Sequence, residues 1–199
     1  MKILAFTDIH GNYRIINKIL KNIKQNDPDV VICSGDITEF GFNLKAIIKR
    51  FENINRPFII IPGNHEDEYE LKNICKEIKN CVYLHKGMYK INEFLFLGHG
   101  GGGFSLIDKD FEKISNEFKK NISKSDKIVF VTHAPIHGTK TDYLEGLGHQ
   151  GNKSYRKFIE EIQPIIAICG HFHENENKSD KIKRTLIINP GKIGRIIEL

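Results

Sequence analysis

MKILAFTDIHGN, residues 1–12, joins an apolar run to a turn that carries an aspartate and a histidine. A short run that is apolar at consecutive positions is typical of a strand covered on both faces, as in the middle of a parallel sheet. Asp8 and His10 stand just past the end of this run, and Gly11 permits the sharp turn that follows. The stretch therefore predicts a buried strand that presents two candidate metal ligands at one edge of a sheet.

The same arrangement recurs farther along the chain. Apolar runs at 30–33, 58–61, 128–131 and 165–169 each precede polar side chains of the types that bind metals. Parallel strands bring their carboxyl ends to one edge of an open sheet, and ligands bind at that edge. We therefore expect the side chains behind these runs to converge; they are Asp36, Asn64, His65, His133, His171 and His173.

Helical patterns separate most of these runs. Apolar residues recur on one face over 12–24, 107–118 and 152–164, and more weakly over 44–51 and 69–78. Asn12, at the start of the first pattern, is of a residue type that commonly caps a helix. The alternation of strands and helices predicts an α/β fold with parallel pairing and with helices on the outside.

Other segments favour antiparallel pairing. The apolar runs 82–84, 88–91 and 94–97 follow one another too closely for helices to intervene, which predicts some antiparallel strands there. Near the end of the chain, 185–189 and 195–199 read as a hairpin-type pair around an Asn-Pro-Gly turn.

The composition favours one compact soluble domain over residues 1–199, because 40% hydrophobic and 28% charged residues suffice for a single core. No apolar run approaches the ~20 residues of a membrane span, so we expect neither an anchor nor a leader. The four cysteines form no C-x-x-C pair and are expected to be reduced thiols. This usage predicts a cytoplasmic protein.

The formal charge of +5 favours acidic partners only weakly, because basic residues are spread among acidic ones. Nucleic acid is a possible partner, but no aromatic residues are spaced among the lysines as a stacking platform requires. The sequence carries no indication of the oligomeric state.

The ligand types point to two cations. The candidates offer oxygen and nitrogen but no sulfur, which suits Mn, Fe, Co, Ni or Zn in an exchangeable site. Seven ligands exceed the needs of one ion with an open position, whereas two ions that share a carboxylate are the usual apparatus for phosphoryl hydrolysis.

The motifs, taken in order, resemble the calcineurin-like metallophosphoesterase family between residues 8 and 173. The resemblance implies a four-layer αββα sandwich, in which two mixed β-sheets are flanked by helices. It also implies roles for the matching residues. Asp8, His10 and His173 would bind one metal, Asn64, His133 and His171 the other, and Asp36 both, while His65 would face the substrate; the motifs are Asp8-Ile9-His10, Gly35-Asp36, Gly63-Asn64-His65-Glu66, Thr132-His133 and Gly170-His171-Phe172-His173.

The expected function is that of a metal-dependent phosphoesterase, which hydrolyses phosphomonoester or phosphodiester bonds of a small phosphate ester or a nucleotide. A hydroxide bound by two divalent metal ions, manganese foremost, would attack phosphorus. His65 would protonate the leaving group as the catalytic acid. Glu66 stands where many relatives carry aspartate, and its carboxylate is expected to hydrogen-bond His65.

Several alternatives stay open. The chain could be a catalytically silent scaffold that keeps the fold. Gly98, Gly100 and Gly103 satisfy a dinucleotide-binding pattern, although no acidic residue closes the next strand. Asn12 could contact phosphate instead of capping a helix, and His85 is expected at the surface. The other unassigned histidines could line the rim of a substrate pocket; they are His99, His137 and His149.

Overall fold

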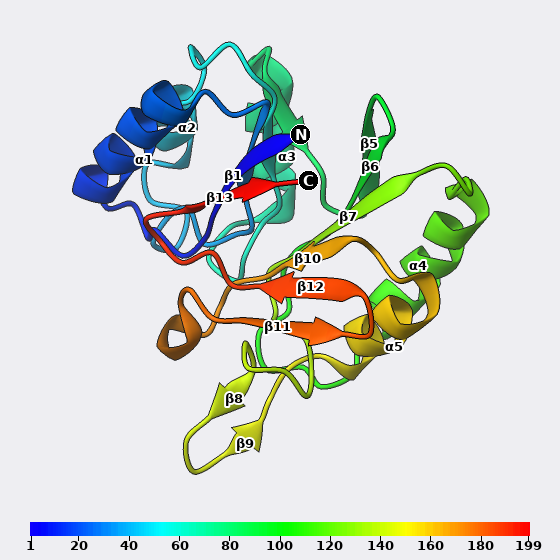
Figure 1. Ribbon diagram of the computed structural model, residues 1–199. Coiled ribbons are helices and arrows are strands. Elements are labelled where there is room, and N and C mark those ends of the chain that lie inside the picture. The colour runs from blue at the N-terminus through cyan, green and yellow to red at the C-terminus, as the bar shows by residue number, and fades with distance from the viewer.

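The computed structural model describes residues 1–199 and contains two mixed β-sheets (Figure 1). In the first sheet, one edge strand is antiparallel to its neighbour and the other four strands are parallel. In spatial order its strands are β13 (Arg195–Glu198), β1 (Lys2–Phe6), β2 (Val30–Cys33), β3 (Phe58–Ile60) and β4 (Cys81–Tyr83).

The second sheet has four parallel central strands and an antiparallel strand at each edge. In spatial order its strands are β11 (Ser179–Ile182), β12 (Thr185–Ile188), β10 (Ile166–Ile168), β7 (Lys127–Thr132), β6 (Phe94–His99) and β5 (Gly87–Ile91). The expected antiparallel pairing near residues 88–97 is thus present. A separate hairpin of β8 (Tyr143–Leu144) and β9 (Gly148–His149) projects from the body of the molecule (Figure 1).

Helices lie on the two outer sides of this pair of sheets (Figure 1). Each predicted helix is present, and its ends follow local chemistry. Asn12, Asp67, Asp108 and Asn152 accept hydrogen bonds from backbone N–H groups of the first turns, as helix-capping side chains do. The helices are α1 (Tyr13–Asn26), α2 (Leu44–Lys49), α3 (Glu68–Glu77), α4 (Lys109–Asn121), α5 (Lys153–Ile162) and a short 3-10 turn, η1 (His173–Asn175).

Three apolar layers hold the four structural layers together. Alternate residues of β1 face opposite ways, so Leu4 and Phe6 pack with α1 and α2, whereas Ile3 and Ala5 pack between the sheets. The third layer joins the outer side of the second sheet to α4 and α5. This arrangement confirms the predicted αββα sandwich.

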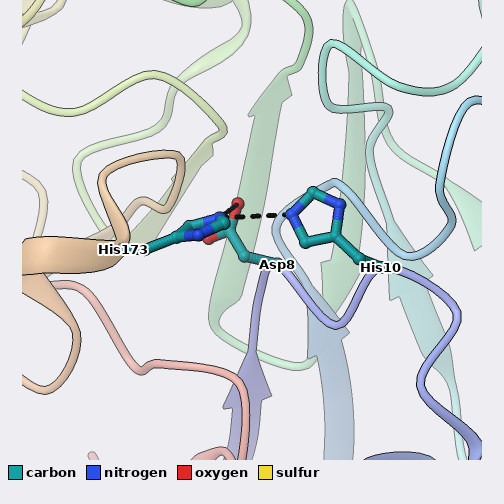
Figure 2. Close-up of side chains that lie close together, drawn as sticks. All are labelled: Asp8, His10 and His173. Carbon is teal, nitrogen blue, oxygen red and sulfur yellow. Dashed lines mark hydrogen bonds and ion pairs between the residues drawn. The ribbon is translucent and has the colours of Figure 1, made fainter.

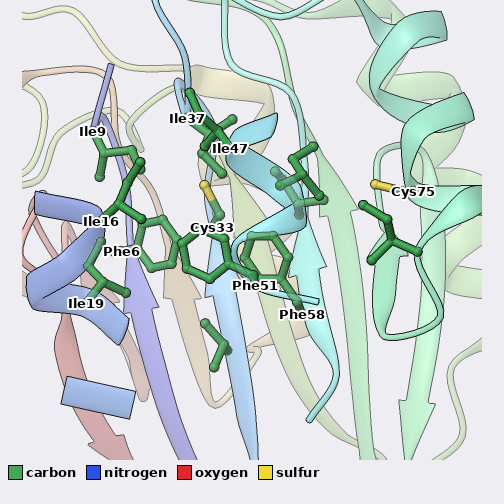
Figure 3. Close-up of a cluster of buried hydrophobic side chains, with 14 of the residues drawn as sticks. Phe6, Ile9, Ile16, Ile19, Cys33, Ile37, Ile47, Phe51, Phe58 and Cys75 are labelled. Carbon is green, nitrogen blue, oxygen red and sulfur yellow. The ribbon is translucent and has the colours of Figure 1, made fainter. Parts of the chain in front are cut away.

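Stacked aromatic rings fill the first apolar layer (Figure 3). The Phe51 ring lies 4.6 Å from that of Phe58 and 5.7 Å from that of Phe6, measured between centroids. Since a slip of one residue would turn every side chain of β1 to the other face, this packing fixes the register of the strand that leads into the candidate site.

The prediction of a hairpin at the end of the chain is wrong. The strand β12 pairs with β10 and β11 in the second sheet, whereas β13 pairs with β1 in the first. The turn at residues 189–194 therefore crosses between sheets. An Asn-Pro-Gly turn can precede a strand of the same sheet or of another sheet. The pairing of β12 and β13 is decided by the neighbouring strands, which the turn does not specify.

None of the helices is both long enough and apolar enough to cross a lipid bilayer.

Candidate active site

The predicted ligands lie together at the carboxyl ends of β1, β2, β3, β7 and β10. The site thus lies where the carboxyl ends of strands in the first sheet meet the carboxyl ends of strands in the second. Three sets of side chains each have their ligand atoms within 4.8 Å of one another, and Asp36 belongs to two of them. The sets are Asp8 with His10 and His173, His10 with Asp36 and His65, and Asp36 with His133 and His171.

The Nε2 atoms of two imidazole rings point toward each other in the first set (Figure 2). Nε2 of His10 lies 3.1 Å from Nε2 of His173, and Nε2 of His173 lies 3.7 Å from the Asp8 carboxylate. Nδ1 of His10 lies 3.1 Å from the carboxylate of Glu39. A proton on Nδ1 would leave the Nε2 lone pair directed at the shared point. Two imidazole nitrogens and a carboxylate aimed at one point fit a divalent cation.

The orientation of His133 is determined by its backbone contact. Nδ1 donates to the carbonyl of Ser34 at 2.9 Å, because a carbonyl can only accept. Nε2 therefore faces the site, 3.3 Å from the Asp36 carboxylate and 3.0 Å from Oδ1 of Asn64. Nε2 of His171 is buried without a hydrogen-bond partner. Donors arranged in this way fit a second cation next to Asp36.

The electrostatics around Asp36 and His133 favour a bound cation. Burial by itself raises the pKa of Asp36, but the hydrogen bond and charge of His133 outweigh it and lower that pKa to about 2. Burial also opposes the charge on His133, yet Asp36 and Asp8 raise the pKa of His133 to about 9. Surroundings that hold a proton on this buried ring favour a metal cation for the same electrostatic reason.

The surroundings of His171 and Asp8 also change the pKa values of these two side chains. Burial, assisted by the charge of His133, lowers the pKa of His171 to about 4, so this ring is neutral at pH 7. For Asp8, the raising effect of burial is outweighed by the hydrogen bond to His173, and the pKa is lowered. Ionised carboxylates and neutral imidazoles are the forms that coordinate metals.

Four of the candidate ligands have a left-handed backbone conformation. Asp8, His10, Asp36 and His171 have φ values of 54°, 45°, 48° and 71°. Left-handed conformations cost L-residues about 1–2 kcal/mol each and persist where the surroundings impose them, often at functional sites. The predicted turns are present, but the candidate ligands themselves carry much of the left-handed conformation.

Two glycines next to the candidate ligands are required by close packing, not by a left-handed conformation. A Cβ atom on Gly63 would collide with the carboxylate of Asp36, and one on Gly170 would collide with Thr7 and Asp8. Neither glycine has a positive φ. They are needed because backbone of one loop packs directly on a candidate ligand of another.

His65 is oriented by the loop that follows β2. Its Nδ1 accepts the backbone N–H of Phe40 at 3.2 Å, which directs Nε2 into the site, 4.0 Å from the Asp36 carboxylate. Glu39 lies 3.7 Å from the same Nδ1.

The prediction that Glu66 hydrogen-bonds His65 is wrong. The Glu66 carboxylate is buried and accepts hydrogen bonds from the backbone N–H groups of Asp36, Thr38 and Gly63 at 2.9–3.0 Å, and from the Thr38 hydroxyl at 2.7 Å. These four hydrogen bonds occupy the lone pairs of both carboxylate oxygens, so none is left for His65. Glu66 thus fixes the loop that carries Asp36, and burial raises its pKa.

Two of the four histidines outside the motifs differ from expectation. His85 is buried, not at the surface, with 6% of its area exposed. His99 is buried as well and its Nδ1 lies 2.7 Å from the Tyr155 hydroxyl, so it does not line a pocket rim. His137 and His149 face the buried carboxylate of Asp142, at 3.6 and 2.7 Å.

Two of the three glycines that match a dinucleotide pattern are accounted for by packing. A Cβ on Gly98 would collide with Leu84, and one on Gly100 with Pro62. Asn12 caps α1 by accepting from the N–H groups of Arg14 and Ile15. Both features therefore have structural explanations.

Glu39, Thr38 and Phe40 are site residues that sequence reasoning missed. They lie two to four positions after Asp36, in a segment without a motif of its own. The nearness of the segment to Asp36 was the only available signal, and it does not tell which side chain turns toward the histidines.

A family model described as calcineurin-like phosphoesterase matches residues 1–175 of the chain. An uncharacterized protein of Methanocaldococcus jannaschii is 32% identical over an alignment that covers 96% of this chain and 88% of that protein. A probable glycerophosphodiester phosphodiesterase of Arcobacter nitrofigilis is 27% identical, with 85% of this chain and 66% of that protein covered. The chain thus spans slightly less than two thirds of the latter relative.

Among solved structures, that of a Thermus thermophilus protein has a TM-score of 0.78 at 15% identity and covers 96% of this chain and 89% of its own. At this level of identity the likeness concerns the fold, and it agrees with the two mixed sheets flanked by helices.

Proposed function

Because the chain belongs to the calcineurin-like phosphoesterase family, we propose that it is a hydrolase of phosphate esters that works with two divalent metal ions. The observation that carries the proposal is the buried Asp36 carboxylate shared by two sets of imidazole ligands. A carboxylate in that position can bridge two cations, and the imidazole nitrogens around it can complete their coordination.

The proposed ligand sets are supported by the grouping of the side chains and by the contact of Asn64 with His133. Asp8, His10 and His173 would hold one ion, and Asn64, His133 and His171 the other, with Asp36 contributing to both. Nitrogen and oxygen donors accept several first-row metals, of which we expect manganese foremost, with iron, cobalt, nickel or zinc as alternatives. When bound, such cations acidify a coordinated water and neutralise charge on the phosphoryl oxygens.

His65 is the proposed catalytic acid. Hydrolysis forms a bond from a water oxygen to phosphorus and breaks the bond to the leaving alcohol, whose oxygen must gain a proton. Nε2 of His65 faces the site and can donate that proton, while Glu39 lies near the opposite ring nitrogen. Positioned acids of this kind contribute roughly 100- to 10,000-fold to rate.

Diesters are favoured among the substrates. A relative that matches 85% of this chain is a probable glycerophosphodiester phosphodiesterase. We therefore place phosphodiesters first and phosphomonoesters second, in both cases as small molecules or nucleotides.

The test is hydrolysis of bis-p-nitrophenyl phosphate and p-nitrophenyl phosphate by the manganese-loaded protein. Activity should require the metal, and His65→Ala should lower kcat roughly 100-fold or more while leaving the bound metal unchanged. Asp36→Ala should abolish both activity and full metal loading.

The competing proposal is a scaffold that keeps the fold without turnover. A folded, metal-loaded protein that hydrolyses neither ester would support the scaffold and refute the hydrolase. Retention of His65 together with the ligand residues favours the hydrolase.

A further inference from the structure

Two phenylalanines at the candidate site are largely exposed, although each ring contacts a histidine. Phe40 is 78% exposed and its ring centroid lies 4.3 Å from that of His65. Phe104 is 68% exposed and its ring centroid lies 5.0 Å from that of His171. Other large apolar side chains are equally exposed, but these two rings lie against histidines of the candidate site, where a ligand that covers them would gain the free energy of burial.

The backbone holds Phe40 in this exposed position. Its φ is 47°, a left-handed conformation that is unusual for a bulky residue. The N–H of Phe40 is bonded to His65, and the next N–H, of Gly41, donates to the Thr38 hydroxyl at 3.2 Å. Because Thr38 is itself held by Glu66, the ring is presented by a fixed turn.

Phe104 is held by a different loop. It follows Gly103, whose φ of 105° is a conformation open to glycine but rarely to other residues. The ring also lies 5.5 Å from that of Phe172 and meets His171 edge to face. Part of the ring is therefore anchored, and the rest stays exposed.

The two rings border different parts of the cluster. His65 belongs to the set with His10 and Asp36, whereas His171 belongs to the set with Asp36 and His133. A phosphorus atom held next to Asp36 would therefore have one aromatic side chain toward each set. A diester has two ester arms, and the arm near the acid His65 is the one that leaves.

We infer that Phe40 and Phe104 form two aromatic walls that select phosphodiesters with a planar ring on each arm, as in aryl or nucleoside diesters. Phe40 contacts the leaving arm and Phe104 the retained arm. The inference rests on the proposed phosphoesterase function. Aromatic side chains stack on planar rings of any kind, so the shared chemistry is the ring face.

The retained arm is tested with two diesters that release the same product. Bis-p-nitrophenyl phosphate keeps an aryl arm, and methyl p-nitrophenyl phosphate keeps a methyl group. Phe104→Ala should lower kcat/KM for the first roughly 3- to 10-fold and leave the second unchanged. Phe104→Trp should preserve the native preference, and Phe42→Ala, at another exposed phenylalanine, should change neither value.

The leaving arm is tested with substitutions of Phe40. Phe40→Ala should lower release of p-nitrophenol from both diesters roughly 3- to 10-fold, and Phe40→Trp should restore it. Phe40→Leu has similar bulk but no ring face. Full restoration by leucine would show that Phe40 only supports His65 and would overturn its assigned role.

Binding gives a readout independent of turnover, because the chain contains no tryptophan. In the metal-loaded Phe104→Trp protein, thymidine monophosphate should quench the emission of the new indole, and inorganic phosphate should not. The indole of Phe42→Trp should respond to neither.

The experiments distinguish failure of the aromatic walls from failure of the proposed phosphoesterase function. Hydrolysis of both diesters with equal losses in Phe104→Ala, and no quenching by the nucleotide, would overturn the aromatic walls and leave the phosphoesterase standing. Absence of hydrolysis of every ester would refute the function, and the inference with it.

Discussion

The histidines of the candidate site are oriented through the ring nitrogen that faces away from it. For His133 that nitrogen donates to the Ser34 carbonyl, and for His10 it lies 3.1 Å from Glu39. In both cases Nε2 is left facing the other ligands. Groups that hold a metal-binding histidine in this way commonly affect metal affinity 10- to 100-fold.

Replacement of Glu39 should therefore weaken metal binding without removing a ligand. We expect Glu39→Gln to raise the Kd for manganese roughly tenfold, the lower end of that range, because Glu39 is half exposed. Isothermal titration of the metal-free protein measures this. Glu52→Gln, at an exposed position after α2, is the matched control, and equal affinities of the Glu39 and Glu52 variants would contradict the assigned role.

The convergence of the candidate ligands could be predicted from the sequence, but the groups that support them could not. Asp8, Asp36 and the histidines after strands are recognisable because their types match metal chemistry and strand ends converge. Glu39 looks like any exposed glutamate. The partner of Glu66 depends on how closely the turn at 36–38 folds back on Gly63, which no spacing reveals.

Among the helices, α1 begins three residues after His10. Asn12 stands between them and caps the helix through its side-chain oxygen. The cap accounts for this side chain without a contact to phosphate.

Asn12→Ala should lower the free energy of unfolding by about 1 kcal/mol, the usual cost of losing such a cap. Asn12→Asp should restore most of it, since a carboxylate accepts the same N–H groups and favours a helix N-terminus. Urea unfolding measures both changes. A loss of phosphoesterase activity in Asn12→Ala at unchanged stability would indicate instead that Asn12 contacts substrate.

Strands and helices with strong patterns were predictable, and their partners were less so. The buried runs at β1, β2, β3, β7 and β10 are apolar at every position, which only central strands tolerate. The strands β12 and β13 were also recognisable, but their assignment to different sheets depends on edges that form elsewhere in the chain. Polar β11 has no apolar pattern and was missed.

In the molecule as a whole, the two sheets are joined by polar as well as apolar contacts. His85, which follows β4 in the first sheet, accepts the N–H of Gly100, which follows β6 in the second, at 2.7 Å. Glu68, Lys86, His99 and Asp110 surround the same ring. Burial, then the charges of His99 and Lys86, lower the pKa of His85 to about 3.

Stability should therefore fall in acid because of this histidine. Its unfolded-state pKa is near 6.5, so between pH 6.5 and 3 the unfolded chain binds the extra proton and folding is disfavoured as the pH falls. The contribution is fully present above pH 6.5. At pH 5 the loss from His85 amounts to about 2 kcal/mol.

His85→Asn keeps an acceptor for Gly100 but cannot titrate. Between pH 7 and pH 5 the native protein should lose about 2 kcal/mol more stability than this variant, as measured by urea unfolding at each pH. His149→Asn, at a half-exposed histidine of the projecting hairpin, is the control. Parallel losses in the native protein and in His85→Asn would contradict the buried, neutral state of His85.

In the proposed site, side chains from both sheets hold two cations on either side of Asp36. Elemental analysis of the native protein, saturated with manganese and dialysed, tests it most directly when compared with Asp36→Ala. We predict two ions per native chain, and at most one in the variant with its fold intact by circular dichroism. A native protein that retains fewer than two ions after dialysis, or a variant that retains both, would rule out two cations that share Asp36.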